Sequence, residues 1–181
     1  VEYPIKGGSA IVLVNADDGK IERRLAMPDS LQAAEVCFLG EDIAFSTVSE
    51  SGSGIFLTDK HLQSDIRCIS EPLPTSIRNL VNDRGVLYFT SDRDGTQELY
   101  SINDGVIRQH TSLKYGGNEF CMNGDSLYFT VLQPEGRLLH TAPLDDGKAV
   151  DFKTIHKYKV AEALTRQEKN LAEAKGVSWV D

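Results

Sequence analysis

The chain has 181 residues, of which 40% are hydrophobic and 25% charged, a composition typical of folded domains rather than of disordered segments. Nineteen Lys and Arg against 27 Asp and Glu give a formal net charge of −8. This charge disfavours a nucleic-acid partner, because phosphate backbones repel an acidic surface. No apolar run approaches the about 20 residues that a membrane-spanning helix needs, so we expect no membrane span.

Three segments along the chain read alike and define an internal repeat. Each holds an apolar run with a phenylalanine, at Phe45, Phe89 and Phe129, which are 44 and 40 residues apart. A glycine follows each run, and these glycines are 41 residues apart: Gly54, Gly95 and Gly136. The landmarks agree on a repeat of about 40 to 45 residues, a length typical of β-propeller blades.

Each repeat divides into four short strand-forming segments separated by turn residues, mostly Asp, Asn and Gly. Before the first full repeat, residues 10–14 and 21–25 are expected to be the last two strands of an earlier one. In the full repeats we expect strands at 36–39, 43–47, 54–58 and 66–69; at 77–81, 86–91, 97–102 and 106–111; and at 119–122, 126–131, 137–142 and 149–155.

The second strand of each repeat is apolar on consecutive residues, as in Val86-Leu87-Tyr88-Phe89. A strand has this pattern when both of its faces are buried. A four-stranded antiparallel blade packed between two neighbouring blades meets that condition. The third strands alternate more, as expected for strands further from the propeller axis. The sequence therefore predicts an all-β fold of β-propeller blades.

One repeat resembles a known family. Residues 87–95, Leu-Tyr-Phe-Thr-Ser-Asp-Arg-Asp-Gly, followed by Glu98-Leu99-Tyr100, are similar to the TolB-type (WD-like) propeller repeat, which also occurs in prolyl oligopeptidase-type and tricorn-like propellers. The other repeats keep only the strand and the later glycine. The resemblance implies propeller blades over residues 1–155 and a periplasmic or other cell-envelope location.

Only about three and a half blades can be counted, whereas propellers of the resembled type close with six or seven. We therefore expect the remaining blades to come from the rest of a longer protein or from another chain. An open row of blades would expose apolar faces and unpaired strand edges.

Residues 156–181 differ in kind from the repeats. From Lys157 to Lys175 there is no Gly or Pro, and Ala, Leu, Glu, Lys, Gln and Arg dominate, all of which favour helix. Gly176 suits the cap position that follows a helix. We expect a C-terminal helix that packs on the propeller or links it to another domain, with Trp179 as an anchor.

No residue is predicted to be catalytic, to bind a cofactor or to ligate a metal. The stretch Ser51-Gly52-Ser53-Gly54 lacks the spacing of a Gly-x-Ser-x-Gly nucleophile elbow and is expected to be a turn. Three cysteines, with no C-x-x-C pair, are expected to be buried thiols: Cys37, Cys68 and Cys121. Four scattered histidines are expected to be ordinary strand or surface residues: His61, His110, His140 and His156.

The segment Asp92-Arg93-Asp94-Gly95 resembles the start of a calcium loop, but Asn103 stands where such a loop has its Glu. We expect a hairpin turn in which an Asp caps backbone N–H groups. Arg93 is expected to be solvated or paired with a neighbouring blade.

Three functions fit these features. The first is a non-catalytic, ligand- or protein-binding scaffold of the bacterial cell envelope, with no cofactor, whose loops contact a protein or glycan. The alternative is the propeller portion of a larger enzyme, such as a prolyl oligopeptidase-type or tricorn-like peptidase, with its catalytic domain outside this segment. The third is catalysis by carboxylates at first-strand starts near the propeller axis, where Glu35 and Glu119 are expected.

Overall fold

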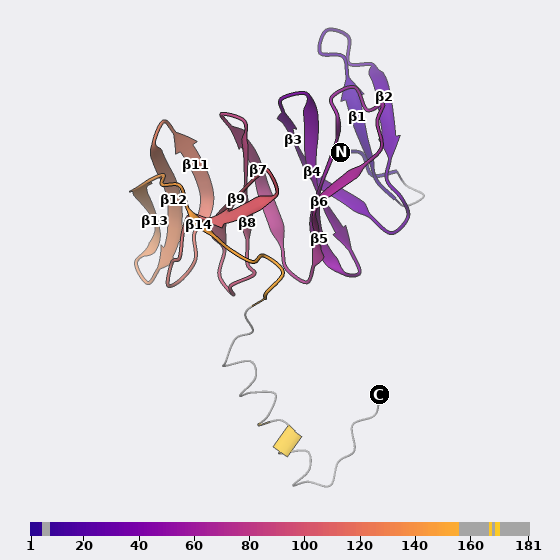
Figure 1. The fold of residues 1–181 in the computed structure, drawn as a ribbon. Helices are drawn as coiled ribbons and strands as arrows, with labels where there is room; N and C mark the ends of the chain where they lie inside the picture. The colour runs from indigo at the N-terminus through magenta and orange to yellow at the C-terminus, as the bar shows by residue number, and fades with distance from the viewer. Residues whose placement is uncertain (5–7, 156–166, 168, 171–181) are drawn as a thin grey trace.

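The computed structural model describes residues 1–4, 8–155, 167 and 169–170, and its strands form four antiparallel sheets that follow one another in chain order (Figure 1). The first sheet contains β1 (Ala10–Val14) and β2 (Ile21–Ala26). The second contains β3 (Gln32–Leu39), β4 (Asp42–Ser49), β5 (Gly52–Asp59) and β6 (Arg67–Leu73). The third contains β7 (Ile77–Asp83), β8 (Val86–Ser91), β9 (Glu98–Asn103), β10 (Val106–Gln109) and β14 (Lys148–Ala149). The fourth contains β11 (Asn118–Asn123), β12 (Ser126–Gln133) and β13 (Gly136–Pro143).

The three repeat phenylalanines occupy matching places in the second, third and fourth sheets, as predicted. Each lies on the second strand of its sheet and faces the sheet that precedes it. Each also pairs with a ring on the third strand: Phe45 with Phe56, Phe89 with Tyr100, and Phe129 with His140. The three segments thus lie in successive sheets at matching strand positions, although the sheets have four, five and three strands.

Three apolar clusters hold the row together, one between each pair of neighbouring sheets. Ile11 of β1 packs in the first cluster with Phe45 and Phe56. The second cluster joins Ile55 to Phe89, and the third joins Leu99 to Phe129. Burial of apolar surface on both faces of the middle sheets is the main source of stability in this arrangement.

The expected burial of the second strands is confirmed for β4 and β8, whose residues are buried on both faces along most of their length. The third strands β5 and β9 are also buried almost throughout. The third strand lies between the second and fourth strands and is covered by both neighbouring sheets. The outer strands of these sheets, the first and the fourth, are more exposed.

The fourth strand predicted at 149–155 does not join the last sheet. Instead β14 pairs with β10 of the third sheet, and Val150 continues this contact by donating its N–H to Ile107 O at 3.0 Å. Phe152 then packs edge-on against Phe89 and Tyr100, at ring distances of 5.6 and 5.4 Å. Phe152 is buried in the apolar cluster between the second and third sheets, and burial of this ring favours the observed path.

The described residues form an open row of sheets rather than a closed ring. The expected helix over 157–175, with Trp179, lies outside the described residues apart from positions 167, 169 and 170. Within the described part of the chain, no helix combines the length and the apolar character needed to cross a bilayer.

Candidate functional site

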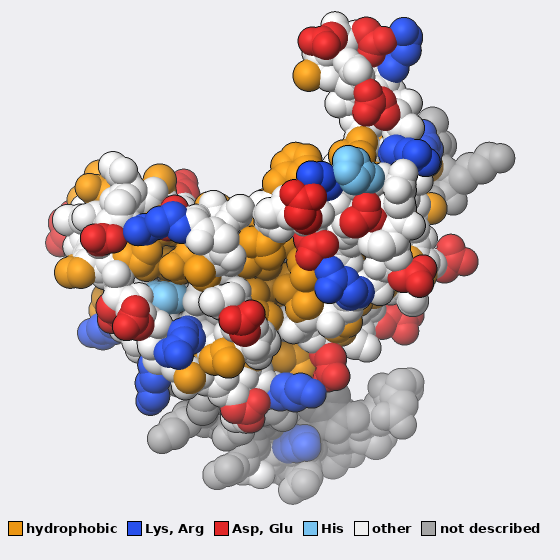
Figure 2. Space-filling model, turned by 45° about the horizontal axis from the view of Figure 1, so that its top comes forward, with side chains coloured by type: hydrophobic (Ala, Val, Ile, Leu, Met, Phe, Trp, Pro, Cys, Tyr) orange, Lys and Arg blue, Asp and Glu red, His pale blue; other side chains and the backbone are white. Residues whose placement is uncertain are grey.

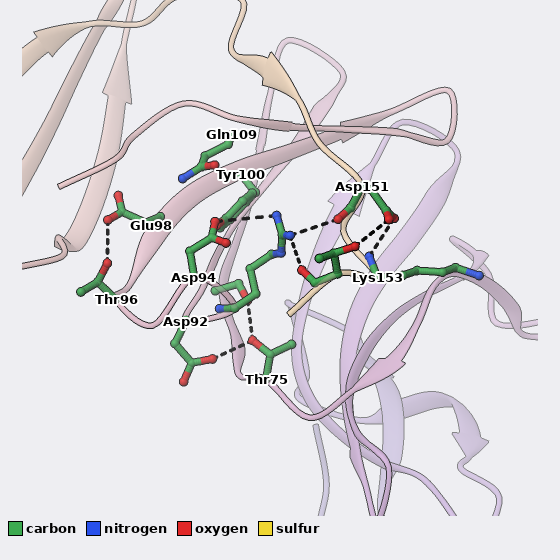
Figure 3. A network of polar contacts seen from close by, with 12 residues as sticks. Thr75, Asp92, Asp94, Thr96, Glu98, Tyr100, Gln109, Asp151 and Lys153 are labelled. Carbon is green, nitrogen blue, oxygen red and sulfur yellow. Dashed lines mark hydrogen bonds and ion pairs between the residues drawn. The ribbon is translucent and has the colours of Figure 1, made fainter. Parts of the chain in front are cut away.

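The Ser-Asp-Arg-Asp-Gly turn after β8 lies in a network of polar contacts (Figure 3). The Arg93 side chain is only 3% exposed. Its Nη2 donates to the carbonyl oxygen of Asp151 at 3.0 Å and to that of Thr154. Its guanidinium lies 5.2 Å from the ring centroid of Phe152, within the range of a cation–π contact. Arg93 therefore fixes the segment that follows β14 to the third sheet.

Arg93 is not solvated; its hydrogen bonds go to residues 151–154, which the sequence assigned to the next repeat but which follow β14 of the third sheet. Its guanidinium is buried next to the turn that follows β8, and the Asp94 carboxylate of the same turn lies 3.7 Å away. The Asp94 carboxylate also accepts a 2.7 Å hydrogen bond from the Tyr100 hydroxyl. Burial, together with this carboxylate, raises the pKa of Tyr100, so the phenol stays protonated as a donor.

Asp92 caps the preceding connection, as the turn chemistry predicted. Its Oδ1 accepts from Ser76 N at 2.7 Å and from Thr75 Oγ1 at 2.6 Å. Burial favours the neutral acid, but these donors outweigh it and hold the pKa of Asp92 below its usual value of 3.8. The carboxylate therefore ties the strand that enters the third sheet to the turn that leaves β8.

A buried carboxylate, Glu98, joins the third sheet to the link that leads to the fourth. It accepts hydrogen bonds from Thr96 Oγ1 at 2.9 Å, Thr111 Oγ1 at 2.6 Å and Leu113 N at 2.8 Å. Buried charged groups are tolerated when they are satisfied in this way. Sequence reasoning assigned Glu98 only to the repeat pattern, and no local signal indicated its three donors.

A groove with a volume of about 410 Å³ lies between β6 and the segment 150–153 that Arg93 holds. Ile107, Val150 and Phe152 supply apolar lining. The Lys153 ammonium and the Glu71 carboxylate, 2.9 Å apart, join its two walls. The groove therefore offers apolar surface next to exposed charges of both signs. It is the best candidate for a binding site in the described residues.

The two candidate catalytic carboxylates occupy equivalent positions, at irregular points of β3 and β11. Glu35 is half-buried and accepts a hydrogen bond from Leu80 N of the next sheet at 3.1 Å. Glu119 is exposed and pairs with Arg137 at 2.6 Å. The third sheet separates the two residues. The structure therefore does not bring them together as an acid–base pair.

His110 is a structural residue. Its Nε2 lies 2.8 Å from Ser101 Oγ, and its Nδ1 lies 3.1 Å from the carbonyl oxygen of Asp145. Burial lowers the pKa of the His110 ring, against the opposing effect of Asp145. His140 stacks on Phe129 at 5.8 Å and His61 is exposed, whereas His156 lies outside the described residues. Within the described residues, no three His, Cys, Asp or Glu side chains gather as a possible metal site.

The cysteines are less buried than predicted. Cys37 is half-buried, and Cys68 and Cys121 are exposed. Cys68 lines the groove on a fourth strand, and Cys121 lies on the last sheet, which no further sheet covers in the structure. The expectation of buried thiols assumed that every strand is covered, and it fails at the rim and at the end of the row.

Comparison with solved structures shows what this arrangement is similar to. The fold is similar to that of TolB. The crystal structure of TolB from Acinetobacter baumannii matches with a TM-score of 0.55 and 19% sequence identity. The match covers 77% of this chain and 36% of the TolB chain, so the chain spans about a third of that protein's length. No family model matches the sequence, and no curated protein matches it.

Proposed function

We propose that this chain is part of a non-catalytic β-propeller that binds a protein or glycan partner in the bacterial cell envelope. The likeness to the TolB structure and the Ser-Asp-Arg-Asp-Gly repeat support the fold part of this proposal. The envelope location rests on the same resemblance. Residues 1–155 would form the blades. The rest of a longer protein, or another chain, would supply the remaining ones.

The observation that carries the binding role is the groove between β6 and residues 150–153. Its apolar lining can accept side chains or sugar faces, and the Lys153–Glu71 pair can orient a polar partner. The buried Arg93 holds one wall of the groove in place before binding. A pre-formed wall reduces the entropy lost on association.

A capture experiment tests this role. Purified protein, immobilised at its N-terminus, is incubated with envelope extract and separately with a glycan array. A Lys153→Glu variant reverses the charge at the groove and places it beside Glu71, so we expect it to lose the captured partner. The matched control is Lys60→Glu, which breaks a 2.6 Å ion pair with Glu41 outside the groove lining. Equal capture by both variants would contradict the groove as the binding site.

Hydrolase assays test the non-catalytic part of the proposal. We expect no turnover of peptide or glycan panels by the purified chain. Turnover that disappears in Glu35→Gln or Glu119→Gln would instead support catalysis by these carboxylates. Their placement argues against this, because Glu35 is bonded to Leu80 and Glu119 to Arg137.

A further inference from the structure

The outer edges of the second and third sheets are occupied differently. β6 and β10 are the fourth strands of these two sheets. β10 carries a fifth strand, because β14 pairs with it antiparallel, Arg108 with Ala149 and Gln109 with Lys148. β6 is the last strand of its sheet, and no strand in the described part of the chain pairs with its outer edge. The third sheet thus shows an added strand at the place that stays open in the second.

The added strand of the third sheet shows what such a position accepts. Directly after β14, the Val150 N–H donates to Ile107 O at 3.0 Å, so the main chain supplies the pairing. The side chains that follow alternate. Val150 packs against the apolar cluster between the second and third sheets, and Phe152 is buried in it, whereas the side chains of Asp151 and Lys153 are exposed. Main-chain pairing combined with alternate apolar side chains is how an extended peptide adds to a sheet edge.

The groove runs along the open edge of β6. Successive side chains of a strand point to opposite faces of its sheet. The groove is nevertheless lined by consecutive residues of β6, 68–71, and by consecutive residues of the opposite wall, 150–153. A cavity that touches consecutive residues lies beside a strand rather than over one of its faces. The groove therefore gives access to the backbone groups of β6 as well as to its side chains.

The edge of β6 is irregular, which restricts what can pair with it. The register between β5 and β6 shifts on both sides of Ser70. Pro72 has no N–H to donate. Bulges and proline on an edge strand hinder non-specific pairing. A partner strand must therefore match the short stretch of residues 67–71, which favours one specific segment over general aggregation.

The side chains around this edge complement an extended peptide. The apolar lining continues the cluster between the second and third sheets through four partly buried residues: Ile69, Leu73, Ile107 and Val150. On the face shown in Figure 2, hydrophobic side chains are likewise exposed, with acidic and basic ones around them. Glu71 and Lys153 place opposite charges on the two walls, at 66% and 70% exposure. Such an exposed pair contributes little, so charged side chains of a partner can replace it. A glycan has no regular row of N–H and C=O groups to match the strand edge.

We propose that the open edge of β6 accepts an extended peptide strand from a partner protein, which becomes the fifth strand of the second sheet. The strand pairs with the backbone of residues 67–71 and inserts alternate apolar side chains toward Ile69 and Ile107. Its outward side chains pair with Glu71 and Lys153. This proposal rests on the groove as the binding site of the proposed function, and it names the partner as an extended segment of a protein rather than a glycan.

A peptide selection tests this mode of binding. A display library of random linear peptides, each of about ten residues, is selected on the immobilised full chain. The strongest binder is synthesised with a fluorescent label, and fluorescence anisotropy gives its Kd. Two variants of this peptide carry N-methyl groups on the backbone at alternate positions, one at the even and one at the odd positions. We expect one variant to bind at least about tenfold more weakly and the other to change little, because only alternate N–H groups of a strand face its neighbour.

Two exposed cysteines show where the peptide binds. Cys68 lines the groove on β6, and Cys121 lies on the last sheet. We expect the bound peptide to slow the alkylation of Cys68 at least about tenfold and to leave the rate of Cys121 unchanged. In separate variants, Cys68→Trp should obstruct the groove and weaken peptide binding at least about tenfold. The matched control, Cys121→Trp, should bind the peptide as the parent protein does.

Three results would overturn the proposal. The first is a selection that yields no peptide, or only peptides that leave the alkylation rate of Cys68 unchanged. The second is equal binding by the two N-methylated variants, which would show that no strand pairs through one edge. The third is a peptide-free protein with a solution mass of twice 20.0 kDa and a protected Cys68, which would make a second copy the occupant.

The outcome is separable from that of the capture experiment. Capture that depends on Lys153, together with a failed peptide selection, would mean that the groove binds a ligand other than a strand. A peptide that protects Cys68, together with no captured partner, would support strand addition and contradict only the envelope partner.

Discussion

The ring of Phe89 lies 5.8 Å from the ring of Tyr100, at an interplanar angle of 22°, across the paired strands β8 and β9. Phe45 and Phe56 repeat this relationship one sheet earlier, at 5.9 Å and 22°. Phe152 closes the far side of the Phe89–Tyr100 pair with an edge-on contact. The rings of Phe89, Tyr100 and Phe152 fill the space between the second and third sheets, and those of Phe45 and Phe56 lie between the first and second, so the cohesion of the row depends on them.

Replacing Phe89 with Ala should lower the free energy of unfolding by about 3–5 kcal/mol, because it leaves a cavity among fully buried side chains. Urea denaturation followed by circular dichroism measures the change. Phe38→Ala is the control, since that ring is 63% exposed, and its effect should stay within about 0.5 kcal/mol. Similar losses in the two variants would show that the sheets are not held by this cluster.

Replacing Arg93 with Met should free the segment 151–154. Two carbonyl oxygens lose their donor and Asp94 loses a nearby cation, so we expect a loss of about 1–3 kcal/mol in stability. Hydrogen exchange of the backbone amides at 151–154 should accelerate more than exchange in β4. Lys at this position should not restore protection, because it lacks the planar fork that reaches both carbonyls.

The matched control for Arg93 is Arg84→Met. Arg84 is 61% exposed and pairs with Asp83 and Asp125 at 3.1 and 3.3 Å. Exposed ion pairs contribute little, so its loss should cost less than about 1 kcal/mol and leave exchange at 151–154 unchanged. Equal acceleration in both variants would mean that Arg93 does not hold the segment.

Much of the fold could be predicted because each repeat is marked by residues close together in the sequence. Turn residues at regular spacing, and a phenylalanine on each second strand, place the sheets without knowledge of distant contacts. The path of residues 148–155 could not be predicted in this way. Its strand pattern fits the last sheet equally well, and only the packing of Phe152 between Phe89 and Tyr100 decides where it goes.

The candidate site was less accessible to sequence reasoning. Arg93 lies in a turn that reads as exposed, and its burial depends on carbonyl groups 58 and 61 residues further along the chain. Glu35 and Glu119 were predicted at first-strand starts; the structure places Glu119 near the start of β11 but Glu35 in the middle of β3, at its irregular point. Their partners come from a neighbouring sheet for Glu35 and from β12 and β13 for Glu119. No spacing in the sequence specifies such partners.

Cys37 should be the slowest cysteine to alkylate. Burial, reinforced by the nearby Glu35 carboxylate, raises the pKa of its thiol to about 11 from a usual value of 9.0. Because the thiolate is the nucleophile, its population at pH 8 falls by about a hundredfold. Alkylation by iodoacetamide at pH 8, read by mass spectrometry, should modify the exposed Cys121 long before Cys37. Comparable alkylation rates for Cys37 and Cys121 would show that β3 opens readily to the reagent.

The stability of the protein should fall in acid partly through Asp92. Its folded-state pKa lies below 3.8, because Thr75 and Ser76 donate to the carboxylate and outweigh its burial. A group with a lowered folded pKa stabilises the fold above its unfolded pKa, and this contribution is lost as the pH falls through the folded value. The contribution of Asp92 is therefore complete at neutral pH and declines below about pH 4.

An Asp92→Asn variant tests this contribution. It should be less stable than the parent protein at pH 7, and the difference should shrink as the pH approaches 3, because protonation removes the same charge from the parent. The midpoints of urea denaturation, determined at half-unit steps of pH for the variant and the parent protein, measure the stability difference and its change with pH. Asp125→Asn, at a carboxylate that is 92% exposed, serves as the control and should follow the parent curve. A constant gap between Asp92→Asn and the parent from pH 7 to pH 3 would mean that the carboxylate's charge does not stabilise this connection.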